Sequence, residues 1–177
     1  QAIVRCASEA ELFGQICRDS VQIGDMAMAW IGLIDRESRQ VKPIASAGTG
    51  LEYLHDVKIS VDSEDPYSHG PSGVAIRENR PVWCQDFFKD PMTQPWRQRA
   101  SRYGWRSTAA LPIHKNGIVI GIFCLYANKL AAFDEEVRDL LVKMAWDISF
   151  ALDNFDRDLK RKQVEASLQQ SEQFLRT

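Results

Sequence analysis

Two long apolar segments separated by a short polar turn constrain the fold of this 177-residue chain more than any other feature. The segments are STAALPIH (107–114) and IVIGIFCLYA (118–127), and the turn between them is Lys-Asn-Gly. Asn-Gly between two apolar runs is a strong signal for a β-hairpin. A third segment, MAMAWIGLID (26–35), is too uniformly apolar for one of its faces to contact water. The sequence therefore predicts a β-sheet that is covered on both faces.

The two ends of the chain carry helical patterns that can supply this cover. Apolar residues recur at helical spacing over the first twenty residues, which predicts an amphipathic helix. Near the other end Asp134 is a suitable N-cap, and neither Pro nor Gly occurs from there to Thr177, so one very long helix is expected. Its first half has a wide apolar face. From Asp153 on it carries five acidic and five basic residues, as expected of a solvated helix that leaves the domain.

The order of the expected elements indicates the fold class. A helix and a first hairpin are followed by an irregular middle region with short helices, then by the second strand pair and the long helix. This order predicts an α+β domain with a central antiparallel β-sheet of about five to six strands. The amino- and carboxy-terminal helices are expected on one face of the sheet, and the irregular middle region on the other.

Composition and charge argue against several classes of partner. The formal net charge of -2 gives no general attraction to nucleic acid or to an anionic membrane, and no apolar run reaches the roughly 18 residues that span a bilayer. The four cysteines, at 6, 17, 84 and 124, have no C-x-x-C spacing, which indicates reduced, mostly buried thiols and a cytoplasmic location. We therefore expect no nucleic acid partner and no membrane contact by this segment, which is expected to be part of a longer protein.

Several segments in this order resemble the GAF domain family, the sensory module of bacterial signalling proteins, phytochromes and cyclic-nucleotide phosphodiesterases. The resemblance covers about residues 2–155 and rests on AWIGLID, GPSGVAIRENRPVWCQD, STAALPI, GIVIGIFCLYA and FDEEVRDLLVKMAWDISFALDN. The tail EASLQQSEQFLRT is similar to the segment that leads into a PAS domain. The resemblance implies a GAF-like sensory domain at 1–155 and a helical signalling linker at 156–177, leading to a further domain of a bacterial multidomain signalling protein.

The GAF resemblance also implies a pocket, because short helices and loops of that fold cover one sheet face and enclose a cavity. Here the middle region is rich in aromatic residues, and PWRQRASRYGWR holds four arginines and no acid. On a helix, Arg99 and Arg102 would point away, so Arg97 and Arg106 are expected to reach an anionic or planar polar ligand. The alternative is that the aromatic side chains simply fill the core. The candidate ligand-binding residues are Trp30, Tyr53, Tyr67, His69, Trp83, Asp86, Trp96, Arg97, Trp105, Arg106 and Ser107.

Other kinds of site find little support in the sequence. GPSG (70–73) is followed by no Gly-Lys-Ser/Thr, so it is not a Walker loop, and its glycines suit a turn and close helix packing. Cys84 and His69 lack an orienting acid and an oxyanion hole at a recognisable spacing. The three histidines are too scattered for a metal signature. No catalytic or metal-ligating residue is predicted, and the cofactor is unknown.

The sequence thus predicts a non-catalytic sensory domain that binds an unknown small molecule and relays its state through the C-terminal helix to a signalling output domain, as in two-component or cyclic-di-GMP signalling. Two alternatives are a redox enzyme of the free methionine sulfoxide reductase type, if Cys84 and Cys124 meet in the pocket, and a ligand-free dimerisation module. A homodimer through the C-terminal helix is expected. Its predicted seam consists of Leu159, Ala166, Leu168 and Leu175.

Overall fold

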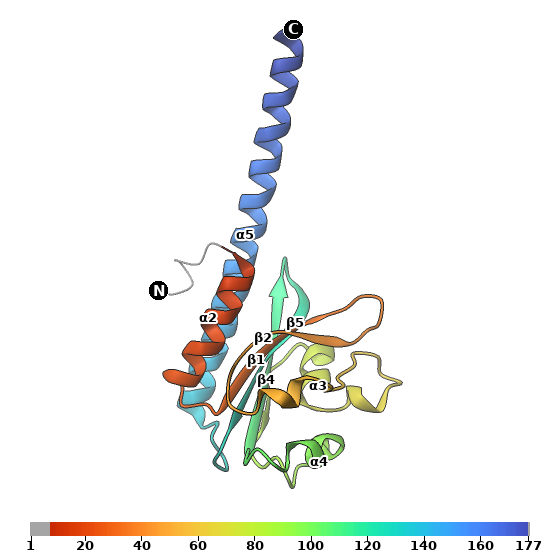
Figure 1. The fold of residues 1–177 in the computed structure, drawn as a ribbon, viewed down its shortest axis with the longest axis vertical. Helices are drawn as coiled ribbons and strands as arrows, with labels where there is room; N and C mark the ends of the chain where they lie inside the picture. The colour runs from red at the N-terminus through yellow and green to blue at the C-terminus, as the bar shows by residue number, and fades with distance from the viewer. Residues whose placement is uncertain (1–7, 177) are drawn as a thin grey trace.

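The computed structural model describes residues 8–176 as an antiparallel β-sheet with helices on both of its faces (Figure 1). Five strands stand in the order β2-β1-β5-β4-β3, and every neighbouring pair is antiparallel. The strands are β1 (Met28–Ile34), β2 (Val41–Gly48), β3 (Val82–Cys84), β4 (Ser107–Lys115) and β5 (Ile118–Ala127). The predicted α+β fold with a central antiparallel sheet is therefore confirmed.

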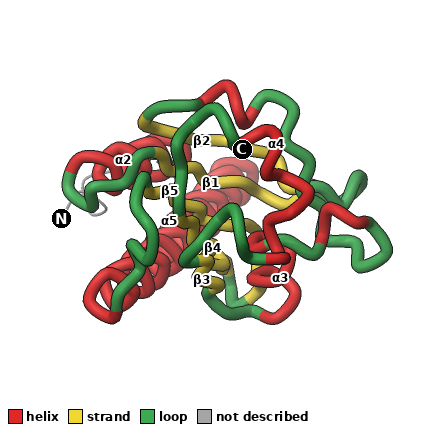
Figure 2. Tube along the Cα trace, turned by 90° about the horizontal axis from the view of Figure 1, so that it is seen from below, coloured by secondary structure: helices red, strands yellow, loops and turns green. Residues whose placement is uncertain are grey.

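Two layers cover the sheet. Helices α2 (Glu9–Gln22) and α5 (Glu135–Arg176) lie on one face, as expected for the two terminal helices (Figure 1). The middle region lies on the other face (Figure 2). It comprises α3 (Pro71–Glu78), α4 (Arg97–Ala100) and the 3-10 turns η1 (Leu51–Leu54), η2 (Pro66–Ser68) and η3 (Pro91–Trp96). The part of the predicted first helix that falls on residues 1–7 lies outside the described residues.

The hairpin of β4 and β5 forms as its Asn-Gly turn predicts. Asn116 and Gly117 both have positive φ, 53° and 77°, which is the backbone of a tight two-residue hairpin turn. Ser107 pairs with Ala127 at the far end of the hairpin, and the pairing is interrupted only by an irregularity between Ile113 and His114.

Each strand of this hairpin contributes to both layers because successive side chains point to opposite faces. Ala110 of β4 and Cys124 of β5 pack with the middle region, whereas Leu111 and Phe123 pack with α2 and α5. Both clusters contain residues with almost no exposed surface. The sheet is therefore a shared wall between the middle region and the terminal helices.

Helix α5 extends far beyond the sheet (Figure 1). The Oδ1 atom of Asp134 accepts a hydrogen bond from the Val137 amide at 2.9 Å, so this residue caps the helix as predicted. All residues from 157 to 176 are exposed. Among the helices in the described part of the chain, none combines the length and the apolar character needed to cross a membrane.

Candidate functional site

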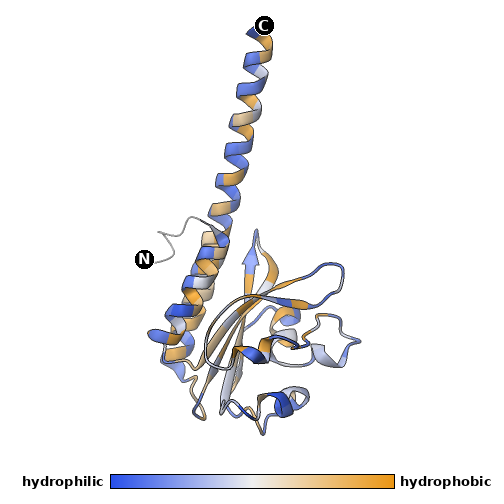
Figure 3. Cartoon of the chain, in the orientation of Figure 1, coloured by the Kyte–Doolittle hydropathy of each residue, from blue (hydrophilic) through white to orange (hydrophobic). Residues whose placement is uncertain are grey.

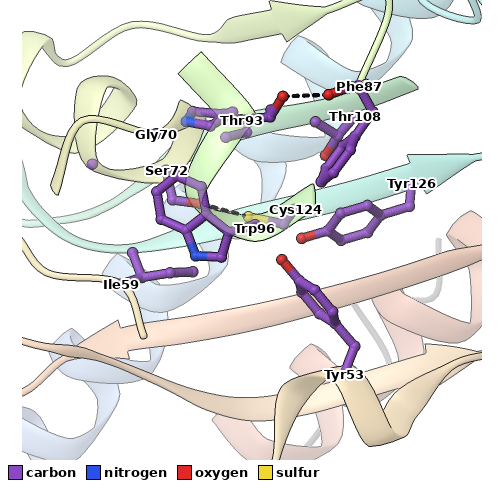
Figure 4. Close-up of a pocket in the computed structure, with 13 residues that line it drawn as sticks. Tyr53, Ile59, Gly70, Ser72, Phe87, Thr93, Trp96, Thr108, Cys124 and Tyr126 are labelled. Carbon is purple, nitrogen blue, oxygen red and sulfur yellow. Dashed lines mark hydrogen bonds between the residues drawn. The ribbon is translucent and has the colours of Figure 1, made fainter. Parts of the chain in front are cut away.

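A small cavity lies between the sheet and the middle region (Figure 4). Its volume is about 30 Å³. Strands β4 and β5 form its floor, the first turn of α3 forms one wall, and η1 and η3 contribute one residue and two residues respectively. The lining residues are Tyr53, Ile59, Gly70, Pro71, Ser72, Gly73, Phe87, Thr93, Trp96, Thr108, Ala110, Cys124 and Tyr126.

The polar side chains that line the cavity are all uncharged. Ser72 Oγ lies 3.1 Å from Cys124 Sγ, and the Thr108 hydroxyl donates to the Leu125 carbonyl at 2.8 Å. The Thr93 hydroxyl donates to the Phe87 carbonyl (Figure 4). Hydroxyl oxygens that donate in this way keep lone pairs with which they can accept a hydrogen bond. The cavity is therefore suited to a molecule with hydrogen-bonding groups and without net charge.

Two tyrosine hydroxyls point toward each other at one end of the cavity, those of Tyr53 and Tyr126 (Figure 4). Burial raises the pKa of both phenols above the usual value of 10, so both are neutral at physiological pH. Trp30 Nε1 lies 3.4 Å from the Tyr126 hydroxyl, on the same face of the sheet as the cavity. These groups place neutral donors and acceptors at the inner end of the site.

The two thiols of the sequence hypothesis do not meet. Cys124 lines the cavity, whereas Cys84 lies on β3, separated from β5 by β4 and displaced along it by two residues. Two strand spacings amount to about 10 Å, and a disulfide needs Cα atoms within about 7 Å. Burial raises the pKa of both thiols to about 12, which leaves them protonated.

Trp96 closes the cavity on the side of the middle region. Its Nε1 donates to the Lys58 carbonyl at 3.0 Å, and its ring meets that of Tyr67 edge-on with 6.0 Å between the ring centroids. The ring also lies against Gly70, where any Cβ would collide with it. A glycine at this position is therefore what lets Trp96 fold down over the cavity.

A cluster of aromatic rings packs around the tyrosine end of the cavity. The Trp105 ring lies tilted against Tyr126 with 4.4 Å between centroids and meets Tyr53 edge-on at 5.1 Å. Arg99 donates to the Tyr53 carbonyl at 2.9 Å and lies over the Tyr53 ring. The expectation that Arg99 points away is therefore wrong, because α4 is only one turn long and presents this side chain to η1.

The structure separates the predicted site residues into four groups. Tyr53 and Trp96 line the cavity. Trp30 and Trp105 belong to the apolar cluster around the cavity, and Tyr67 packs against that cluster. His69 and Arg106 are exposed, Asp86 lies in the loop between β3 and η3, and Arg97 is the first residue of α4. Trp83 and Ser107 lie on the opposite face of the sheet.

Strand alternation explains the last group. Trp83 pairs with Ala109, whose side chain faces α5, so the indole packs against Phe133 and Arg138 and not in the pocket. Ser107 has the same direction and donates to the Lys129 carbonyl at 2.8 Å. Neither side chain can reach the cavity without a shift of register.

The arginines of the predicted anionic site do not line the cavity. Arg97, at the start of α4, donates to the carbonyl of Asp90, the N-cap of η3, at 2.6 Å, and Arg106 is exposed. No charged side chain lines the cavity among residues 8–176. Arg97 and Arg106 therefore lie outside the cavity lining, and an anionic ligand bound by Arg97 stays a prediction.

Most residues of the cavity wall are not among the ligand-binding residues predicted from the sequence, because they are small or apolar. Thr108 and Ala110 carry no chemical signal in the sequence, and only their shared strand direction unites them. The GPSG segment was expected to serve packing, and Gly73 does so, since a Cβ there would collide with the Ser68 carbonyl. The same segment also forms the cavity wall.

A family model described as the GAF domain matches residues 6–153. The chain belongs to the GAF domain family. No curated protein sequence gives a significant match. Among solved structures, the GAF domain of the Acinetobacter phosphoenolpyruvate-protein phosphotransferase superposes with a TM-score of 0.69 at 16% identity, covering 90% of this chain and 91% of the other.

Two further structures show how widely this GAF fold is used. A free methionine-R-sulfoxide reductase from Neisseria meningitidis, solved with its substrate, has a TM-score of 0.69 at 18% identity and covers 85% of this chain and 81% of its own. A Sinorhizobium meliloti domain, from a protein described as a two-component sensor histidine kinase, has a TM-score of 0.63 at 17% identity and covers 84% and 94%. At these identities the similarity establishes the fold alone.

The prediction that this GAF domain is not an enzyme is wrong, because enzymes are found among the proteins that share its fold. Free methionine-R-sulfoxide reductases from Neisseria meningitidis, Staphylococcus aureus and Thermoplasma acidophilum share the architecture. The fold is therefore compatible with catalysis as well as with sensing, and the site must distinguish them.

Proposed function

We propose that this GAF domain is a regulatory module that binds a small molecule in the cavity and relays its occupancy through α5. The observation that carries the proposal is the shared wall: cavity-lining Ala110 and Cys124 alternate along β4 and β5 with residues that pack on α5. A shift of these strands on ligand binding changes both surfaces together, because packed interiors transmit displacement.

The lining indicates the chemical class of the ligand. Hydroxyls, one thiol and aromatic edges supply neutral hydrogen-bond partners, and Phe87 and Trp96 supply apolar faces. A compact, uncharged molecule with a planar part matches these groups. The present cavity holds about one water molecule. Trp96 must therefore move for a ligand to enter.

The turn of the β4–β5 hairpin makes a second contact between the sheet and α5, through which the proposed relay can act. The Asn116 amide donates to Asp153 Oδ1 at 2.7 Å, and its side-chain amide donates to Asp156 Oδ2 at 3.1 Å. These bonds hold α5 at the point beyond which it is fully exposed. In the proposed arrangement, α5 leads to a PAS-like or other output domain of a bacterial signalling protein.

Identification of bound molecules tests this proposal directly. Small molecules released from the purified, heat-denatured chain would be analysed by mass spectrometry, and the Ala110→Ile variant, whose side chain fills the cavity, would be analysed beside it. We expect a released compound from the wild type that is absent from the variant, with both proteins folded by circular dichroism. A ligand at a hundred times its Kd should stabilise the domain by about 2.7 kcal/mol.

The absence of any released compound would contradict the proposal if free amino acids, nucleobases and nucleosides also left the melting temperature unchanged. Equal recovery of a compound from both proteins would place its binding outside the cavity.

Reduction of free methionine sulfoxide is the second candidate function, because the Cys124 thiol lines the cavity. Its high pKa and its distance from Cys84 weigh against it. The assay would supply methionine-R-sulfoxide and dithiothreitol to the wild type, to Cys124→Ser and to Cys84→Ser. Turnover that is lost only in Cys124→Ser would establish the reductase.

A further inference from the structure

A second hollow opens at the edge of the sheet beside α5, because β3 is much shorter than β4. Strand β3 has three residues and pairs with Thr108–Ala110, so the part of β4 from Leu111 to His114 has no further strand beside it among the described residues. The segment that joins α3 to β3 and the side of α5 flank this open edge. The gap between them is a crevice of about 160 Å³, and it shares no lining residue with the cavity under Trp96.

The walls of the crevice are mostly apolar. Pro81 lies on one side, Leu111 and Pro112 of β4 form the base, and Val142 and Ala145 of α5 form the other side. The part of α5 beside the sheet is rich in apolar residues (Figure 3). An apolar cavity of about 150 Å³ takes up one benzene molecule. The crevice therefore has room for a molecule of about one ring without any movement of the chain.

Two uncharged polar side chains line the crevice, those of Asn79 and His114. Nε2 of His114 lies 2.6 Å from Asn79 Oδ1. Because an amide oxygen only accepts, Nε2 carries the hydrogen of this bond, which leaves Nδ1 as an acceptor and the Asn79 amide nitrogen as a donor. Burial lowers the pKa of His114 below its usual 6.5, so the ring is neutral at physiological pH.

Trp146 of α5 adds a flat aromatic surface to the same crevice. Its ring is nearly parallel to the His114 imidazole, with 12° between planes and 6.0 Å between centroids, which is an offset stack. The side chain is nevertheless 67% exposed, so much of the indole remains accessible. An indole that is already held against a neighbour loses little entropy when a planar molecule packs on it.

We propose that this crevice is a second binding site, which takes an uncharged planar molecule of one ring that carries an amide or lactam group. The ring would lie between the apolar walls and Trp146, and the amide group would donate to His114 and accept from Asn79. Apart from the neutral His114, no ionisable side chain lines the crevice in the described part of the chain, so a carboxylate would be desolvated without a partner. The proposal does not depend on the function of the cavity under Trp96, because the two sites have no residue in common.

The open edge of β4 is poorly suited to the other obvious occupant, an added β-strand. A strand that pairs with an edge needs backbone donors there. Pro112 has no amide hydrogen, and the His114 amide already donates to Ser149 Oγ at 3.1 Å. A small molecule, which uses side chains in place of the backbone ladder, is therefore the better match.

Nuclear magnetic resonance of the ¹⁵N-labelled 1–177 chain tests the site with benzamide and nicotinamide as probes. Both should shift the signals of the Trp146 indole and the His114 ring with a Kd of about 1 mM, as expected for a one-ring molecule. The Trp96 indole, which covers the other cavity, should not shift. Benzoate has the same ring with a carboxylate and should bind at least about tenfold more weakly. No shift with either amide, or equal binding of benzoate, would overturn the proposal.

Substitutions of the lining test the roles of the named side chains. Asn79 has a φ of 50°, which glycine adopts freely, so Asn79→Gly removes the amide and keeps the backbone. It should weaken benzamide binding at least about fivefold. Arg39→Gly, at a φ of 61° between β1 and β2 and outside the crevice, should leave the Kd unchanged. Trp146→Leu should also weaken binding, and its spectrum identifies the Trp146 signal.

Unchanged affinity in both Asn79→Gly and Trp146→Leu would place the probes elsewhere and refute the site. A Trp146 signal that shifts when the protein alone is diluted would show that a second copy of the chain covers the crevice. That result would also overturn the proposal, because the crevice would then be closed to a small molecule.

Discussion

At the scale of single residues, the cavity depends on a match between Gly70 and Trp96. The indole covers the cavity because position 70 has no side chain, and its N–H is satisfied by the Lys58 carbonyl. Neither residue could close the site alone. Trp96 therefore covers the pocket by packing against Gly70, and a single hydrogen bond from its side chain, to the Lys58 carbonyl, holds it there.

Removal of the Trp96 side chain should open the cavity at a measurable cost. Trp96→Ala should lower the free energy of unfolding by about 3–5 kcal/mol, since a buried aromatic is lost and a void remains. Trp96→Phe keeps an aromatic ring over the cavity. It should lower the free energy of unfolding by only roughly 1 kcal/mol, because the hydrogen bond of the indole N–H is lost. Urea unfolding measures the free energy of unfolding of both variants. Similar free energies for the two would contradict the prediction that an aromatic ring at position 96 covers the cavity.

The thiols of Cys84 and Cys124 should resist alkylation in the folded protein. Burial raises the pKa of each to about 12, so the reactive thiolate is scarce at about pH 8. Mass spectrometry after iodoacetamide treatment should find both unlabelled in the native chain and labelled after unfolding in guanidinium. Rapid native labelling of Cys124 would instead support the reductase candidate.

At the scale of elements, His114 joins the helix beside the cavity to the helix that leaves the domain. Its ring nitrogen Nε2 lies 2.6 Å from Asn79 Oδ1, at the C-cap of α3, and its ring stacks on Trp146 of α5. Its backbone amide donates to Ser149 Oγ of α5 at 3.1 Å. Three elements therefore meet at the end of β4.

This junction should make the domain less stable in mild acid. Burial lowers the pKa of His114 below its usual 6.5, with Asp153 acting weakly in the opposite direction. The unfolded chain then binds more protons, so stability is present above about pH 6.5 and is lost as the pH falls through the lower folded-state pKa. Urea unfolding at several pH values should show this loss in the wild type and a smaller one in His114→Gln. An identical pH dependence of the two proteins would assign the effect to other groups.

At the scale of the whole molecule, the sheet and its two layers form one body, and the distal part of α5 stands apart from it (Figure 1). Residues 157–176 are exposed throughout, so their helical form depends on intrinsic propensity and on ion pairs such as Lys160–Asp156. The domain boundary between residues 155 and 156 stays a prediction. The exposure of residues 157–176 is consistent with it.

A chain that ends at Arg161 should therefore keep the domain intact. Its free energy of unfolding should differ from that of the full chain by less than about 0.5 kcal/mol under monomeric conditions, because only exposed residues are removed. The homodimer predicted through the C-terminal helix should be weaker, since Ala166, Leu168 and Leu175 of the predicted seam are lost. Circular dichroism and sedimentation measure the two effects. Loss of cooperative unfolding would mean that the projecting helix stabilises the sheet.

The sequence by itself determined which segments are strands and helices, because those properties follow from local patterns. The Asn116-Gly117 turn, the Asp134 cap and the absence of Pro and Gly after it needed no distant partner. Only the tertiary structure decided which side chains form the site. Trp83 faces α5 because of its pairing with β4, and a shift of one residue would have turned it to the cavity. Tyr53, Gly70 and Thr108 come together at the cavity from segments far apart in the chain, and such contacts depend on non-local packing that no local pattern encodes.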